Sequence, residues 1–261
     1  MNERTPLGLT EVADLLDQSP HTREAILVGG QALNVLAVYY GLDAIATAVS
    51  NDIDFFGDAA LAREAGKAWG GQTRKAGMDD HTPNSALVLV DIHEQTHQID
   101  FMSQILGVQA GELQAWAATI EVNGKKFRVM HPLHVLQSQV ENVYGVLDRR
   151  RMGPRAISRT GLAARVAERT IRKYLDGGDI RAALKAAERV AEITATRAGL
   201  RAWHDDALDL LTAIPSHAKW PVDFLEKRLP QIRDKLSKQR ENYARQQMRG
   251  SSQPGSEPGL G

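Results

Sequence analysis

The chain has 261 residues, of which 43% are hydrophobic and 25% are charged. These proportions are ordinary for a globular protein with a substantial core, and the length allows one or two domains. Basic and acidic residues balance at 32 each, so the net charge predicts no polyanionic partner. The absence of cysteine excludes disulfides, thiolate nucleophiles and cysteine zinc sites, and it fits a cytoplasmic protein.

Neither secretion nor membrane insertion is expected from the sequence. The opening segment MNERTPLGLTEV lacks a positively charged leader followed by an apolar run, so we expect no signal peptide. The best apolar stretch, around residues 33–40, is far too short to span a bilayer. We therefore expect no membrane partner.

The first half of the chain alternates between strand-like and helical patterns. Apolar residues at helical spacing predict helices at residues 10–17, 31–40 and 58–69, the first with Thr10 as its N-cap. Apolar runs and alternating patterns predict strands at residues 25–28, 52–56, 72–75, 85–92, 98–102, 119–122 and 126–130. Hairpin turns are expected at residues 94–97 and at Asn123-Gly124.

The composition changes after His131-Pro132, where nearly everything to Gln247 has helical periodicity. We predict helices at residues 133–147, 154–175, 179–198, 201–213 and 222–245. The expected fold is therefore a mixed α/β sheet with flanking helices over residues 1–130, then an all-α helical bundle over residues 131–247. Residues 248–261 are rich in glycine, serine and proline and are predicted to be a disordered tail.

Two carboxylates occupy one face of the strand predicted at residues 52–56. Residues two apart on a strand point to the same side, roughly 6–7 Å apart, so Asp52 and Asp54 can hold divalent cations between them. Hard oxygen ligands suit Mg²⁺ or Mn²⁺. The alternative is that this face is exposed and the two aspartates are merely solvated.

A glycine pair, Gly29-Gly30, lies between a buried strand and a helix start. Glycine lets a phosphate approach the backbone, and a helix N-terminus offers N–H donors and a positive dipole. The alternative is a tight turn that needs glycine for packing only. The order of strand, glycine pair, helix and paired aspartates is more specific than either motif alone.

A third carboxylate, Asp100, lies in the apolar segment QIDFM. If it joins Asp52 and Asp54, it can act as the general base on an attacking hydroxyl or help to ligate the metal. The alternative is an isolated surface aspartate.

The segments LVGGQALNVLAV, NDIDFF and IDFM together resemble the DNA polymerase beta-like nucleotidyltransferase superfamily, and within it the AbiEii/AbiGii-type toxin family. The resemblance covers the first half of the chain well and the helical half in layout. It implies a nucleotidyltransferase fold in which Gly29 and Gly30, followed by Gln31, contact the triphosphate of an NTP. It also implies that Asp52, Asp54 and Asp100 are catalytic and bind Mg²⁺.

The resemblance also implies the reaction and its partners. A nucleoside monophosphate would be transferred from an NTP to an acceptor, tRNA or a protein, with pyrophosphate as the leaving group. A toxin of a toxin–antitoxin pair would have a cognate antitoxin as partner. A small-molecule nucleotidyltransferase of the antibiotic-modifying type, and a catalytically silent nucleotide-binding or partner-binding module, remain the alternatives.

The sequence departs from the toxin family in its helical half. Gln137 and Gln139 stand in the region where family members often carry a lysine. Arg150 and Arg151, with the neighbouring Arg149 and Arg155, can replace that lysine in binding the nucleotide, because arginine neutralises phosphate through bidentate contacts. The same basic cluster is equally compatible with an RNA surface or with a solvated helix end.

Four residues near the start of the helical half have weaker assignments. His131 and His134 lie three apart at a helix start and are predicted to cap the helix or pack against it rather than bind metal. Glu141 and Asn142 are predicted to face the cleft side of the same helix, where they can support the site.

Overall fold

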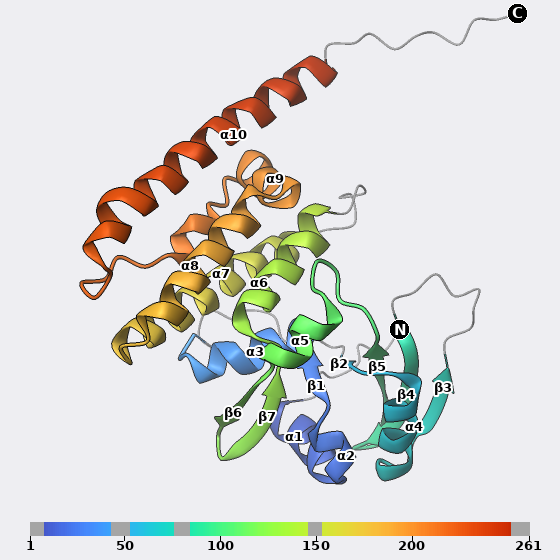
Figure 1. Cartoon of the computed structure of the whole chain (residues 1–261). Helices are drawn as coiled ribbons and strands as arrows, with labels where there is room; N and C mark the ends of the chain where they lie inside the picture. Colours follow the sequence, from blue (N-terminus) through green and yellow to red (C-terminus); the bar gives the residue numbers. More distant parts are fainter. Residues whose placement is uncertain (1–7, 43–52, 76–83, 146–152, 252–261) are drawn as a thin grey trace, which may run out of the picture. The chain divides into compact units, whose positions relative to one another are not determined.

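A computed structural model describes residues 8–42, 53–75, 84–145 and 153–251 (Figure 1). By its internal contacts the chain divides into two compact units, residues 1–170 and 171–261. Residues 131–170 therefore associate with the α/β part, while the domain boundary near residue 130 stays a prediction. We describe each unit by itself.

Within the described residues, one mixed seven-stranded sheet forms the first unit, in the order β3-β4-β5-β2-β1-β7-β6. The β2–β5 and β1–β7 pairs are parallel, and the other neighbouring pairs are antiparallel. The strands are β1 (Ile26–Val28), β2 (Ile53–Phe56), β3 (Gln72–Lys75), β4 (Asn84–Ile92), β5 (Gln95–Met102), β6 (Ala118–Val122) and β7 (Lys125–Val129). This arrangement confirms the expected mixed α/β fold.

An aromatic cluster anchors the central strands. Phe55 of β2 and Phe101 of β5 are fully buried, with ring centroids 5.7 Å apart, and Trp69 packs against both at 6.2 and 6.1 Å. The Trp69 indole N–H also donates a hydrogen bond to the Leu15 carbonyl at 2.7 Å, which ties the first helix to the cluster. Because strand side chains alternate, burying Phe55 and Phe101 turns their neighbours Asp54 and Asp100 to the opposite face of the sheet.

The helices of the first unit begin and end close to the predicted positions. They are α1 (Leu9–Asp17), α2 (Pro20–Arg23), α3 (Gly29–Tyr39), α4 (Ala59–Ala68), α5 (Ala110–Trp116), α6 (Pro132–Val140) and the first part of α7 (Pro154–Asp176). A π-helical turn, Glu141–Gly145, follows α6. The assignment of Thr10 as an N-cap is wrong, because α1 begins at Leu9 with Gly8 before it. Helices α2 and α5 were not predicted.

The two hairpins show how turn chemistry sets register. Asn123 and Gly124 form the predicted turn, with φ values of 52° and 74°. The other turn falls at His93 and Glu94, with φ values of 49° and 63°, so the prediction of residues 94–97 is wrong. Strands β4 and β5 stay paired up to Ile92 and Gln95, which leaves only two residues to reverse the chain. Two positive φ values are what a two-residue hairpin turn requires.

The second unit is helical throughout its regular structure. It contains the end of α7, then α8 (Ile180–Ala195), α9 (Arg197–Asp206), a 3₁₀ turn (Leu210–Ala213), a π-helical turn (Phe224–Arg228) and α10 (Leu229–Ser251). The predicted boundary between α8 and α9 is wrong, because the Thr196 side chain caps α9 by accepting a hydrogen bond from the Gly199 N–H at 3.0 Å. Helix α9 ends at Ala207, whose φ of 54° is left-handed.

Helix α10 continues to Ser251, beyond the predicted helix end at residue 245 and into the segment for which disorder was predicted. The rest of that tail, residues 252–261, lies outside the described residues. Among the described residues, no helix combines the length and the apolar character that crossing a bilayer requires.

A buried histidine begins α6. The His131 Nδ1 atom accepts a hydrogen bond from the Leu133 N–H at 3.2 Å, which confirms the capping prediction. Burial, and to a smaller extent the neighbouring His134 ring, lowers the pKa of His131 to about 4 from its ordinary 6.5. The neutral ring is therefore the form that the fold accommodates.

This depressed pKa predicts a pH-dependent stability. The unfolded chain binds a proton at His131 below pH 6.5, whereas the folded chain binds one only near pH 4. The contribution of neutral His131 to the free energy of unfolding is therefore complete above pH 6.5 and is lost as the pH drops toward 4. The loss is on the order of 3 kcal/mol over that interval. In His131→Asn the asparagine oxygen still caps the helix, so urea unfolding at pH 7 and pH 4.5 should show a smaller loss.

His93→Asn is the matched control, because His93 is an exposed turn residue whose positive φ asparagine tolerates. It should retain the wild-type difference between the two pH values. An equally steep loss in His131→Asn would contradict this role for the buried ring.

Candidate active site

Two of the predicted carboxylates are neighbours on adjacent strands. Asp54 of β2 and Asp100 of β5 are partners in the parallel ladder, flanked by the pairs Ile53–Ile99 and Phe55–Phe101. Paired residues of adjacent strands point to the same face, and such strands lie about 4.8 Å apart. Both side chains are half-buried. The structure therefore brings Asp54 and Asp100 together on one side of the sheet.

Asp100 is oriented by its own strand. The Gln98 Nε2 atom donates a hydrogen bond to Asp100 Oδ1 at 3.0 Å. Gln98 lies two residues before Asp100 and shares its face, so this bond fixes one oxygen of the carboxylate along the strand direction.

Gly29 places the start of α3 against Asp54. Val28, the last residue of β1, pairs with Asp54, and Gly29 follows it with a φ of +62°. A Cβ atom at Gly29 would lie 2.3 Å from Asp54 Oδ2, so only glycine lets the carboxylate approach the backbone this closely. The N-cap residue of α3, Val28, makes no side-chain capping bond, and the first-turn N–H groups form the positive end of the helix dipole. Gly30, half-buried, lies in the same turn.

The remaining predicted site residues either do not line the cavity beside Asp54 or lie outside the described residues. The Gln31 side chain is 1% exposed and accepts a hydrogen bond from Asn34 Nδ2 at 3.3 Å, so it points into the fold. Any contact of Gln31 with a nucleotide would therefore involve its backbone. Asp52, Arg150 and Arg151 lie outside the described residues, and their roles stay predictions. Arg155, at the start of α7, is exposed and is not among the described residues that line the cavity beside Asp54.

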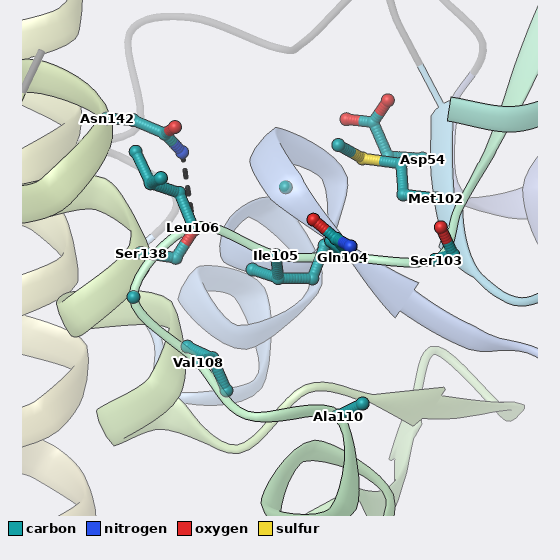
Figure 2. A pocket seen from close by; sticks show the side chains of 12 residues that line it. Asp54, Met102, Ser103, Gln104, Ile105, Leu106, Val108, Ala110, Ser138 and Asn142 are labelled. Atoms are coloured by element: carbon teal, nitrogen blue, oxygen red, sulfur yellow. Dashed lines mark hydrogen bonds between the residues drawn. The ribbon is translucent and has the colours of Figure 1, made fainter. Parts of the chain in front are cut away.

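A cavity of about 620 Å³ opens beside Asp54 and Gly29. Its size falls within the range of small-molecule sites. Figure 2 shows Asp54 and Met102 on one side, Asn142 and Ser138 on the other, and the segment after β5 running between them. The described lining residues are Gly29, Asp54, Met102, Ser103, Gln104, Ile105, Leu106, Gly107, Val108, Ala110, Ser138 and Asn142.

The segment between β5 and α5 forms one wall of this cavity and is held firmly against α6. The Gln137 side chain donates a hydrogen bond to the Gly107 carbonyl. Gly107 has a φ of +78°, and a Cβ atom there would lie 2.7 Å from Glu141 Cγ. Sequence analysis missed this wall, because the segment carries no charged motif. Of the two residues predicted to face the cleft, Asn142 lines the cavity, whereas Glu141 is not among the described lining residues.

The described residues suit a hard divalent cation in part. Asp54 and Asp100 supply two carboxylates from neighbouring strands, which is the donor chemistry that Mg²⁺ and Mn²⁺ prefer. No group of three or more acidic or histidine side chains that could hold a metal occurs within the part of the chain that the structure describes. A third carboxylate would come from Asp52, next to β2.

No protein-family model matches the chain, and no curated protein matches it. Among solved structures, the chain is similar to an antigenic nucleotidyltransferase-like protein from Paracoccidioides brasiliensis, with 15% identity and a TM-score of 0.38. The match covers 68% of this chain and 90% of that one.

The contact between Gly29 and Asp54 predicts a selective effect of Gly29→Ala. Gly70 has the same φ of +62° but nothing within 4 Å of its would-be Cβ, so Gly70→Ala measures the backbone cost alone, about 1 kcal/mol. Gly29→Ala should lose about 1–3 kcal/mol more in urea unfolding, because its methyl group must displace the Asp54 carboxylate. Equal losses in the two variants would show that Asp54 does not press on the helix start.

Proposed function

We propose that this chain is a metal-dependent nucleotidyltransferase, which transfers a nucleoside monophosphate from an NTP to an acceptor. The observation that carries the proposal is the in-register pair Asp54 and Asp100, with the Asp54 carboxylate packed against the first residue of α3 beside a cavity. An acidic pair beside a helix N-terminus provides for cations and for phosphate in one place.

The phosphate contacts would come from the backbone. The first-turn N–H groups of α3 have no acceptor within the helix, and Gly29 and Gly30 keep side chains away from them. A triphosphate bound there would meet the positive end of the helix dipole. Because Asp54 lies against Gly29, the same phosphate would lie next to the carboxylates, and a divalent cation is needed to remove the repulsion between them.

The two carboxylates would have distinct roles in the reaction. Asp54 lines the cavity beside the start of α3, where it would hold a cation at the phosphates. Asp100 is the neighbouring carboxylate, oriented by Gln98, and would bind a second cation or accept the proton of the attacking hydroxyl. When bound, Mg²⁺ or Mn²⁺ would stabilise charge on the entering and departing oxygens. Asp52 would add a third carboxylate to this set.

Three classes of acceptor are compatible with this site: tRNA, a protein and a small molecule. The resemblance of the sequence motifs to AbiEii/AbiGii-type toxins supports tRNA or a protein as the first acceptor to test, with an antitoxin as partner. A small-molecule acceptor would leave the same carboxylate geometry intact. A silent nucleotide-binding module would retain NTP binding but release no pyrophosphate.

Removing either carboxylate charge should abolish transfer without unfolding the protein. Asp54→Asn and Asp100→Asn are each expected to lower Mg²⁺-dependent pyrophosphate release by roughly 100-fold or more, because the carboxylates would hold the cations that neutralise charge at the reacting phosphate. The thermal midpoint should stay constant or rise slightly, since one of two neighbouring like charges is lost. Asp91→Asn, an exposed β4 residue that bonds Thr96, should keep full activity. Unchanged turnover in Asp54→Asn would refute the assignment.

The acceptor can be found by following the label. The protein is incubated with each α-³²P-labelled NTP and Mg²⁺ in the presence of total RNA, of cell protein, or of a small-molecule fraction. Labelled RNA or protein would support the toxin-like interpretation, and labelled small molecules the antibiotic-modifying type. In either case EDTA and Asp54→Asn should remove the label, because transfer requires the cation that the carboxylates hold. NTP binding without label in every fraction would favour the silent module and contradict an active transferase.

A further inference from the structure

The cavity beside Asp54 has a charged end and a neutral end. Of the described residues that line it, Asp54 alone is ionisable. Figure 2 shows its carboxylate across the cavity from the side chains of Asn142 and Ser138. A polyphosphate needs cationic partners, so the described neutral end does not suit one. It suits an uncharged group attached to whatever binds at the charged end.

The walls of the neutral end are apolar and fixed. Ile105, Leu106 and Val108 line it, and Leu106 is 48% exposed, so part of the apolar wall is open to a ligand. The Gln137 side chain donates a hydrogen bond to the Gly107 carbonyl, which holds this segment against α6. Gly107 also packs so closely beside Glu141 that a Cβ atom there would lie 2.7 Å from Glu141 Cγ. The neutral end therefore offers a preformed apolar surface to a flat group.

One pair of polar side chains faces this surface. The Asn142 Nδ2 atom donates a hydrogen bond to Ser138 Oγ at 3.3 Å, and Ser138 itself is only 3% exposed. A carboxamide bonded through one N–H keeps an acceptor oxygen and a second N–H. Asn142 is exposed and lies in the π-helical turn, a kind of local distortion that is frequent at functional sites. Its amide is thus held in one orientation, with a donor and an acceptor still available.

We propose that the neutral end is a nucleobase subsite in which Asn142 reads the hydrogen-bonding edge of the base and Ser138 positions its amide. The inference rests on the proposed function, because the triphosphate of the same NTP would lie at the Gly29 and Asp54 end. A base is flat, apolar on its faces and lined with donors and acceptors at its edge, which matches the apolar wall and the single amide. A sugar would need more polar partners than these.

The test compares nucleotides that differ only at the base edge. CTP and UTP differ by an amino or keto group on the same pyrimidine, and ATP and ITP by the same exchange on a purine. Wild-type protein should bind one member of at least one pair about fivefold or more tightly in titration calorimetry with Mg²⁺, the lower end for a bidentate amide–base contact. Asn142→Leu should bring that ratio close to one while leaving the affinity for inorganic tripolyphosphate unchanged.

The positioning role of Ser138 has its own variants. Ser138→Ala should lower the discrimination between paired nucleotides without changing tripolyphosphate binding. Ser138→Thr, which keeps the hydroxyl group, should retain the wild-type discrimination. Gln72→Leu is the matched control, because Gln72 is an exposed carboxamide on edge strand β3 and does not line the cavity. It should retain the wild-type ratio.

The outcomes separate the two proposals. If neither tripolyphosphate nor any NTP binds the wild-type protein with Mg²⁺, the proposed function fails and the base subsite fails with it. If all bind but wild-type protein does not discriminate within either pair, or Asn142→Leu keeps the wild-type ratio, the subsite is wrong and the nucleotidyltransferase proposal stands. Equal losses of NTP and tripolyphosphate affinity in Asn142→Leu would likewise overturn the subsite, since Asn142 would then act on the phosphates.

Discussion

The approach of the Asp54 carboxylate to the α-carbon of Gly29 is the constraint on which the candidate site depends. β1 ends at Val28, opposite Asp54, and the chain must turn at once into α3. Glycine meets two requirements at that position. It tolerates the positive φ, and it has no Cβ atom, which would lie only 2.3 Å from Asp54 Oδ2. The helix start, the carboxylate and the cavity mouth consequently occupy one small region, although their residues lie far apart in the sequence.

The same arrangement explains why two half-buried carboxylates can be neighbours. Their core-facing partners Phe55 and Phe101 are fully buried, and that burial fixes the strand register that pairs Asp54 with Asp100. A one-residue slip of either strand would send its carboxylate into the core, which is far more costly than the repulsion between the two carboxylates. The aromatic cluster therefore sets the position of the acidic pair, and the positive end of α3 offsets part of the repulsion.

The sheet could be predicted from local patterns because alternation and turn residues act over short distances. Alternating apolar residues gave the strands around Asp54 and Asp100, and Asn123-Gly124 gave its hairpin. Boundaries set by tertiary contacts were not predictable. Thr196 ends α8 by capping the next helix, although α8 was expected to continue to residue 198. Gln31 follows the glycine pair in sequence, yet its side chain points into the core, because a helix turns each successive residue by about 100°.

The neutral end of the cavity could not be predicted from the sequence. Its wall comes from the irregular segment after β5, and its polar pair comes from α6 and the turn that follows. Neither piece carries a motif, since an apolar wall and one amide are common in any core. They form one wall of a cavity only because the hydrogen bond between Gln137 and Gly107 joins the two segments near Asp54. The acidic motif can be recognised from the sequence alone, whereas the neutral end of the cavity is assembled by contacts between segments that no local pattern specifies.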